Sequence, residues 1–207
     1  MRIKWFSLIR ITGLLLVLLY HFFQTIFPGG FFGVDVFFTF SGFLITSLLL
    51  EEFGKARQID LLGFFKRRFY RIVPPVVLMV LVTMPFTFLV RQDYVAGIGG
   101  QIAGVLGFMT NFYEMLTGGS YESQFIPHLF VHNWSLAVEV HYYILWGLAV
   151  WFLSKRSKSS SQLRGMVFLL SAGAFIISFF SMFIGSLMAS SYSSVYFSSL
   201  THVYPFF

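Results

Sequence analysis

The sequence contains no cysteine and little charge, since only 11% of its 207 residues are Asp, Glu, Lys or Arg. The absence of cysteine excludes disulfide bonds, thiolate nucleophiles and thiolate metal sites. The shortage of charge is more informative, because a soluble domain carries about 25% charged residues and presents them to water. Apolar residues are abundant instead: 57% of the residues are hydrophobic, 29 are phenylalanine, and the mean hydropathy is +0.79. The composition excludes a soluble globular domain and predicts a membrane protein.

The basic residues are unevenly placed along the chain. All but one of the 14 lysines and arginines fall into three clusters, which are Arg2, Lys4 and Arg10; Lys55, Arg57, Lys66, Arg67, Arg68 and Arg71; and Lys155, Arg156, Lys158 and Arg164. By the positive-inside rule these clusters, and with them the N-terminus, are expected in the cytosol. The net charge of +6 therefore indicates membrane topology, and no nucleic-acid partner is expected. A phosphate-bearing ligand at the cytosolic face stays a second interpretation.

Charge-free apolar runs predict the transmembrane helices, because a span needs about 20 such residues. We expect spans over residues 5–27, 31–53, 72–90, 134–153 and 166–189. Pro74 and Pro75 are expected in the first turn of the third span, where proline is tolerated. The fold prediction is an all-α, polytopic transmembrane helix bundle of about five to six spans that occupies residues 1–207 without a soluble domain.

The segment 94–113 poses a question of topology. It is uncharged but rich in glycine. If it crosses the membrane completely, the cluster from Lys155 to Arg164 lies outside, against the positive-inside rule. We therefore favour a re-entrant or half-span segment, since irregular backbone at membrane depth is tolerated when it is buried in protein or faces a cavity.

Two ionisable residues fall in the first span. Arg10 and His21 stand at i and i+11, about three helical turns apart, and so share one helix face. Arg10 is near the cytosolic end and His21 is in the outer half. An ionisable residue inside a span is a functional candidate because burying it is costly. The alternative is that Arg10 extends to the membrane interface and that His21 is a packed donor between helices.

The second span carries a polar stripe. Asp35, Thr39, Gly42 and Thr46 follow one helix face and are expected to face the bundle, with Ser41 beside them. Because a short turn joins the first two spans, Asp35 is expected at about the depth of His21, where it could orient His21 as a general base. The alternative is an Asp that caps the first turn of the span.

The span over residues 134–153 repeats this pattern with Ser135, Glu139, Tyr142 and Trp146, and Glu139 is its only carboxylate. His128 and His132 precede it at i and i+4, a spacing that suits a metal when further ligands exist. Because no such partner accompanies them, no metal site is predicted.

Three arginines, Arg67, Arg68 and Arg71, lie in a basic segment before the third span. The planar guanidinium group suits phosphate, so this segment is a candidate phosphate site. Lipid headgroups are the alternative ligand.

These motifs together resemble those of the integral-membrane acyltransferase family 3. Four of them match in order: Arg10 and His21 as Arg-x10-His, Gly33 to Ile45 as the second-span signature, Lys66-Arg67-Arg68 with Arg71 and Pro74 as the basic segment, and His132 to Tyr143 as the His-x-Trp-Ser-Leu-x-x-Glu motif. Within the family, the resemblance is to O-acetyltransferases of cell-envelope polysaccharides, and peptidoglycan O-acetyltransferases are the most similar type.

The resemblance implies an O-acyltransferase that passes an acetyl group from cytosolic acetyl-CoA, a co-substrate rather than a bound cofactor, to a glycan hydroxyl outside a bacterial plasma membrane. In this interpretation His21 is the base or transient acyl acceptor, with Asp35 and Glu139 as further catalytic residues. The donor and substrate would be bound by Arg10, Arg67, Arg68, Arg71, Ser41, Ser135 and His132.

The family's membrane domain has roughly ten spans, so we expect this chain to be its N-terminal part and inactive alone. Relatives often continue into an extracytoplasmic esterase-like domain. The expected partners are therefore such a domain and membrane lipid. The alternative function is a polytopic carrier or flippase of the cell envelope, in which the same polar stripes line a substrate path without covalent chemistry.

Overall fold

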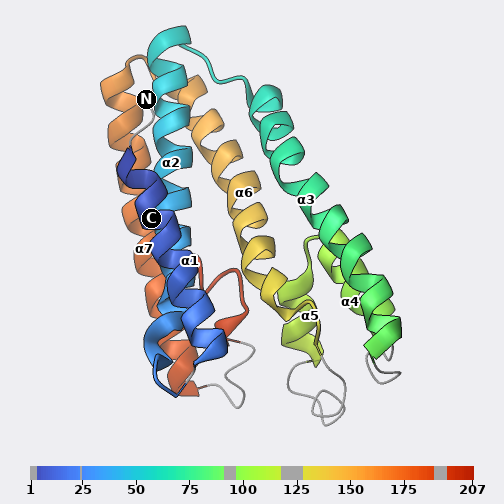
Figure 1. Cartoon of the computed structure of the whole chain (residues 1–207). Helices are drawn as coiled ribbons and strands as arrows, with labels where there is room; N and C mark the ends of the chain where they lie inside the picture. Colours follow the sequence, from blue (N-terminus) through green and yellow to red (C-terminus); the bar gives the residue numbers. More distant parts are fainter. Residues whose placement is uncertain (1–3, 24, 91–96, 118–127, 189–194) are drawn as a thin grey trace.

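The computed structural model describes residues 4–23, 25–90, 97–117, 128–188 and 195–207, and these residues form helices and turns without a strand (Figure 1). The α-helices are α1 (Lys4–Phe22), α2 (Gly33–Ala56), α3 (Leu61–Val90), α4 (Ile98–Leu106), α5 (Thr110–Thr117), α6 (Trp134–Arg156) and α7 (Ser160–Met188). Short 3-10 turns occur at η1 (Pro28–Phe32), η4 (Val131–Asn133) and η5 (Tyr204–Phe206). The all-α fold prediction is confirmed.

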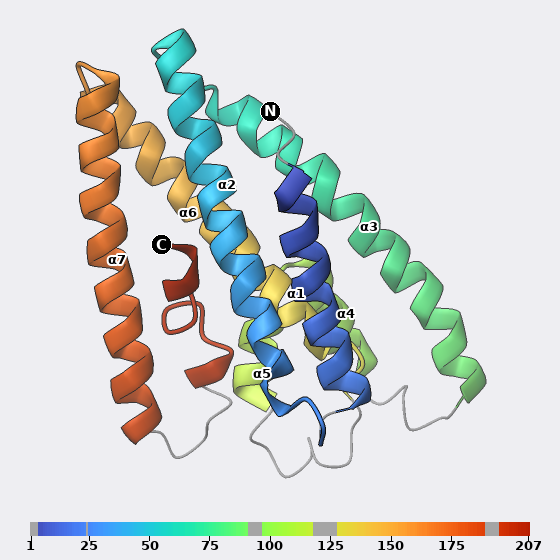
Figure 2. The ribbon, with the colours of Figure 1, turned by 60° about the vertical axis from the view of Figure 1, so that its left-hand side comes forward.

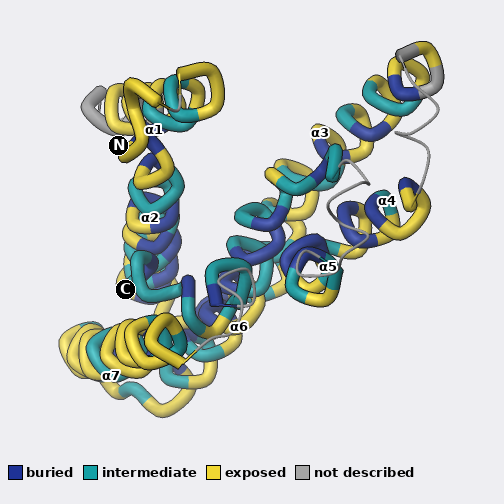
Figure 3. The backbone as a smooth tube through the Cα atoms, turned by 90° about the horizontal axis from the view of Figure 1, so that it is seen from below, coloured by how far each residue is buried: buried dark blue, intermediate teal, exposed yellow. Residues whose placement is uncertain are grey.

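Among the described residues, four helical stretches are long and apolar enough to cross a membrane: Pro28–Ala56, Leu61–Thr87, Val131–Arg156 and Ser160–Met188. The shortest has 26 residues, and such a helix is about 39 Å long against a hydrocarbon core of about 30 Å. In α1 the described apolar part, Ile11–Phe22, is shorter. Buried residues concentrate on α2 and α6, whereas α1 and α7 are mostly exposed (Figure 3). The chain is therefore a helical membrane bundle whose apolar outer surface suits lipid.

The loops that follow α2 and α6 lie at the same end of the bundle (Figure 1). Arg57 joins them, because its Nη2 donates to the carbonyl oxygen of Lys158 at 2.6 Å and its Nη1 donates to Ser160 Oγ at 3.2 Å. The second and third basic clusters are thus on one side, as the positive-inside argument predicted.

This arrangement follows from the segment between α3 and α6. The helix α4 has nine residues and is about 14 Å long, too short to cross a bilayer. It turns at Gly107 and Phe108, where Phe108 has a φ of 53°, and α5 packs back against it. The prediction that this segment does not cross completely is confirmed over residues 97–113; residues 94–96 lie outside the described part.

The predicted end of the first span and the predicted start of the third are wrong, since α1 ends at Phe22 and α3 begins before residue 72. The helix α3 begins at Leu61, so Pro74 and Pro75 lie inside it rather than in its first turn. The basic segment is helical and continues directly into the apolar span. Membrane helices accommodate such prolines because neighbouring groups satisfy the freed carbonyls. Arg67, Arg68 and Arg71 consequently project from a helix.

The segment 195–207 returns between α2, α6 and α7 (Figures 1 and 2). Phe206 stacks on Tyr142 of α6, with ring centroids 4.1 Å apart, and on Phe38 of α2 at 4.4 Å. The closest approach is at Gly42, where an added Cβ would lie 1.9 Å from the Phe206 carbonyl oxygen. Because glycine has no side chain, the segment 195–207 can pack directly against α2 at this position.

The predicted stripe on α2 faces the bundle at three of its four positions. Asp35 contacts His202, Gly42 meets Phe206, and Thr46 accepts a hydrogen bond of 2.8 Å from Trp146 Nε1. Thr39, in contrast, is exposed.

A methyl group at Gly42 is expected to destabilise the bundle. We expect Gly42→Ala to lower the free energy of unfolding by about 1–3 kcal/mol, because the Phe206 backbone must move. The matched control is Gly54→Ala in the same helix, where nothing lies within 4 Å; this change is expected to stabilise by about 0.5–1 kcal/mol. Thermal unfolding in detergent micelles measures both, and equal melting temperatures for the two variants would contradict the close approach.

Candidate functional site

A polar cavity lies among α1, α2, α3 and α6. Its volume is about 330 Å³, and it is lined by Val17, Val34, Phe37, Phe38, Phe40, Ser41, Arg71, Ser135, Leu136 and Glu139. Four of these residues were sequence candidates, and they come from three helices. The structure thus brings together Ser41, Arg71, Ser135 and Glu139.

Glu139 is the centre of the hydrogen bonding at this cavity. Its Oε1 accepts a bond of 2.5 Å from Ser41 Oγ and another from the Tyr143 hydroxyl. The guanidinium of Arg68 lies over the Tyr143 ring, 5.5 Å from its centroid. A carboxylate inside a helix bundle needs such donors, because an unpaired charge there is strongly disfavoured.

Tyr143 is a residue that sequence reasoning missed. Its spacing of i+4 from Glu139 was the available signal. Tyr142, which the predicted stripe favoured, instead packs against Phe206 and Trp146.

Two further cavities continue in turn from the first, the smaller next to it and the larger beyond. One of about 230 Å³ is lined by Arg68, Arg71, Ile72, Pro75, Val76, Leu136, Glu139 and Tyr143. The other, of about 410 Å³, lies between α2 and α3 at the end that carries the basic loops, and is lined by Leu48, Leu49, Glu51, Glu52, Lys55, Phe64, Arg67 and Arg68. Because neighbouring cavities share Arg68 or Arg71, a line of arginines leads from the basic end to Glu139.

The basic end is less positive than the sequence suggests. Arg67 Nη2 lies 3.4 Å from Glu52 Oε2, and Lys55 Nζ lies 2.5 Å from Glu51 Oε1. These carboxylates come from the end of α2. Lys55, Glu51 and Arg67 are exposed and Glu52 is half-buried, so the cations of these pairs are weakly held and can exchange their partner for another anion.

His21 meets His132 beside the polar cavity. Their ring centroids are 4.5 Å apart, and the rings are nearly perpendicular at 86°. His21 Nδ1 lies 2.8 Å from the carbonyl oxygen of Val17. Since a carbonyl oxygen only accepts, Nδ1 carries the proton, which leaves the Nε2 lone pair of neutral His21 available as a base.

The cavity and this histidine pair are linked through the backbone. Val17 and Ser135 line the cavity, and Ser135 Oγ donates to the His132 carbonyl oxygen at 3.3 Å. His21 and His132 therefore lie near the cavity that Ser135 and Glu139 line.

Asp35 does not orient His21. Its Oδ1 instead lies 3.1 Å from His202 Nε2, and Asp35 stands in the first turn of α2, where a carboxylate is favourable. The reason is packing: α1 approaches α2 on the side of Gly33, where an added Cβ would lie 2.6 Å from the Gly13 carbonyl oxygen. Asp35 faces the segment 195–207. Arg10 belongs to α1, but its side chain lies outside the described part of the chain.

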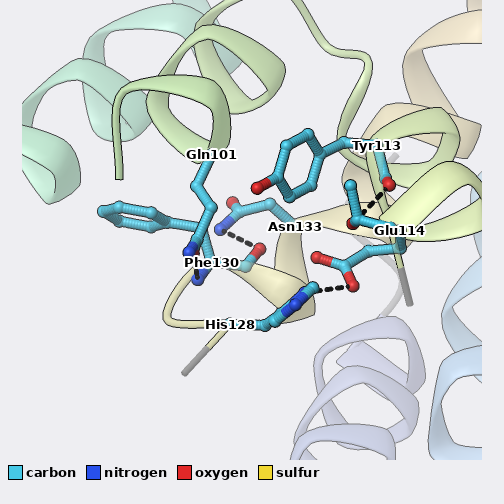
Figure 4. A network of polar contacts seen from close by, with 7 residues as sticks. Gln101, Tyr113, Glu114, His128, Phe130 and Asn133 are labelled. Atoms are coloured by element: carbon cyan, nitrogen blue, oxygen red, sulfur yellow. Dashed lines mark hydrogen bonds and ion pairs between the residues drawn. The ribbon is translucent and has the colours of Figure 1, made fainter. Parts of the chain in front are cut away.

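A second polar cluster joins α4, α5 and η4 (Figure 4). His128 Nδ1 lies 2.7 Å from Glu114 Oε2, Gln101 Oε1 accepts from the Phe130 backbone N–H at 3.5 Å, and Asn133 Nδ2 donates to the Phe130 carbonyl oxygen at 3.3 Å. His128 thus pairs with a carboxylate. Within the described ranges, no three His, Asp or Glu side chains gather as metal ligands.

Glu114 gives this cluster a pH dependence. Burial raises the pKa of the Glu114 carboxyl above its usual 4.5, and His128 offsets part of the rise. A carboxyl whose pKa is higher in the folded state stabilises the fold below the unfolded pKa, and this contribution is lost as the pH rises through the folded pKa.

We therefore expect Glu114→Gln to flatten the pH profile of stability. From pH 4.5 upward, the melting temperature of the unmodified chain in micelles should fall relative to that of the variant. If the melting temperatures of the two proteins changed with pH in parallel, the fold would not favour the protonated form of Glu114.

The chain is similar to known acyltransferases. The family profile described as "Acyltransferase domain" matches residues 3–207. The O-acetyltransferase OatA of Staphylococcus aureus (strain NCTC 8325) is 33% identical over 171 residues, which cover 82% of this chain and 28% of that protein. A putative O-acetyltransferase of Staphylococcus aureus (strain COL) is 35% identical over 136 residues, 66% of this chain and 22% of that protein. The chain thus spans about a quarter of the length of these curated relatives. No solved structure matches it significantly.

Proposed function

The chain belongs to this acyltransferase family, as its motifs predicted, and we propose that it carries the acyl-transfer site of a membrane O-acetyltransferase. The observation that supports this most directly is the convergence of Ser41, Arg71, Ser135 and Glu139 on one cavity beside the His21–His132 pair. The donor is acetyl-CoA from the cytosol, and the acceptor is a hydroxyl of a cell-envelope glycan such as peptidoglycan.

The proposed orientation places the basic loops in the cytosol of a bacterial plasma membrane, by the positive-inside rule. The α2–α3 and α6–α7 loops share one end, held together by Arg57, and α1 begins in the same half of the bundle (Figure 2). His21 and His132 then lie in the outer half. The site would receive its donor from one side and its acceptor from the other.

The phosphates of the donor would bind to the arginines at the cytosolic end of the bundle. Arg67 and Arg68 line the cavity at the cytosolic end. The pair of exposed Arg67 with half-buried Glu52 can open to an incoming phosphate. Arg71 lies deeper, at the polar cavity, where a guanidinium stabilises negative charge on the carbonyl oxygen of the thioester in the transition state.

His21 is the general base of the proposed reaction. Its Nε2 takes the proton of the acceptor hydroxyl, the hydroxyl oxygen bonds to the acetyl carbon, and the carbon–sulfur bond of the donor breaks. The imidazolium then returns the proton to the departing thiolate. The Val17 carbonyl fixes the required tautomer, because it accepts only from Nδ1–H.

His21→Ala is expected to lower acetyl transfer by at least about a hundredfold, the lower end of what a positioned base contributes. The measurement is transfer of radiolabel from acetyl-CoA to glycan in proteoliposomes that hold the complete gene product. Phe22→Ala, which alters the exposed neighbour of His21, should keep activity. If His21→Ala retains activity at an equal membrane level, His21 is not the base. Acceptor movement without label would favour a carrier instead.

Arg67→Ala is expected to raise the KM for acetyl-CoA by about tenfold with little change in kcat, because a charge-assisted hydrogen bond to phosphate is worth about 1.5–3 kcal/mol. Arg164→Ala removes the same charge from the exposed start of α7 and serves as the control. An equal rise in KM for both variants would show that only the overall charge matters.

A further inference from the structure

Asp35 and His202 are joined across 167 residues of sequence. His202 is 4% exposed, and its Nε2 lies 3.1 Å from Asp35 Oδ1. An ionised carboxylate only accepts hydrogen bonds, so Nε2 is the donor. The other ring nitrogen, Nδ1, is buried without a partner among the described residues. Within the described part of the chain, the bond to Asp35 is the one hydrogen bond of the His202 side chain.

Aromatic rings surround this histidine. Its ring centroid lies 4.8 Å from that of Tyr196, 5.1 Å from that of Trp134, and 6.0 Å from those of Phe38 and Tyr204. Burial, with Asp35 as a further cause, raises the pKa of Tyr196 to about 12, so this hydroxyl stays protonated at neutral pH. His202 is therefore enclosed by uncharged aromatic rings, whereas the Asp35 side chain is 21% exposed.

Two of these rings connect the pair to the acyl-transfer site. Phe38 lines the polar cavity one turn before Ser41 on α2. Trp134 is the first residue of α6 and stands between His132 and Ser135. Asp35 belongs to α2, and His202 packs on Trp134 of α6, so their hydrogen bond ties the outer ends of the two helices that flank the cavity.

We propose that Asp35 and His202 form a positioning pair that holds the first turn of α6 against α2 and so keeps His132 next to His21. This inference rests on the proposed function. The pair touches no reacting atom; it acts through Trp134. Because the donor enters at the opposite end, loss of the pair should lower kcat and leave the donor KM unchanged.

The test uses the complete gene product in proteoliposomes. His202→Phe keeps a ring in the aromatic enclosure but removes the donor, and is expected to lower kcat at least about tenfold, because a small misplacement of reacting groups is costly. His202→Gln keeps an N–H donor for Asp35 and should restore most of kcat. The control is His141→Phe, which breaks the 2.9 Å contact between His141 and Ser199 and so loosens the same segment without touching Asp35.

A second measurement does not depend on activity. In protein labelled with 5-fluorotryptophan, Asp35→Leu should shift the fluorine resonance of Trp134, whereas His141→Phe should not. Unchanged kcat in His202→Phe, an equal loss in His141→Phe, or an unmoved Trp134 resonance each overturns the proposal. If the unmodified protein transfers no acetyl group, the proposed function fails, and the Trp134 resonance alone then decides whether the pair positions α6.

Discussion

The hydrogen bond from Ser41 to Glu139 joins α2 to α6 inside the bundle, and the rest of the site is arranged around it. A membrane offers no water to satisfy a carboxylate, so Glu139 needs donors from the protein itself. Ser41 and Tyr143 supply them, and Arg68 lies over the tyrosine ring. This requirement fixes the separation of the two helices and leaves the adjoining space as a polar cavity.

The same requirement explains the other links between helices. Trp146 donates to Thr46, Asn111 of α5 donates to Ser199, and His202 pairs with Asp35. Each link joins segments that are far apart in sequence. The apolar surfaces facing lipid contribute little selectivity between helices, because lipid tails are as apolar as the side chains. Polar contacts therefore set which helices are neighbours, and the candidate site uses the same contacts.

Helical spacing predicted which helix faces turn into the bundle, but not which distant residues those faces contact. The stripes through Asp35 and through Ser135 and Glu139 did identify the faces that turn into the bundle, because a repeat of 3.6 residues is a local property. The partner of Asp35 was not predictable in this way, since it depends on how a distant segment folds back. His202 nevertheless carried a signal: it is an ionisable residue in a long stretch without formal charge, where such residues are functional candidates.

The short helices α4 and α5 also determine the electrical polarity of the bundle. Because they do not cross, α6 and α7 keep Lys155, Arg156 and Lys158 on the same side as Arg57. With one more crossing these residues would face the opposite compartment. In the proposed orientation, with the basic loops at the negative interior of the membrane, moving each of these charges to the opposite side would cost about 2.3 kcal/mol per 100 mV. A break of a few residues after α4 thus lets the membrane potential itself favour the observed arrangement.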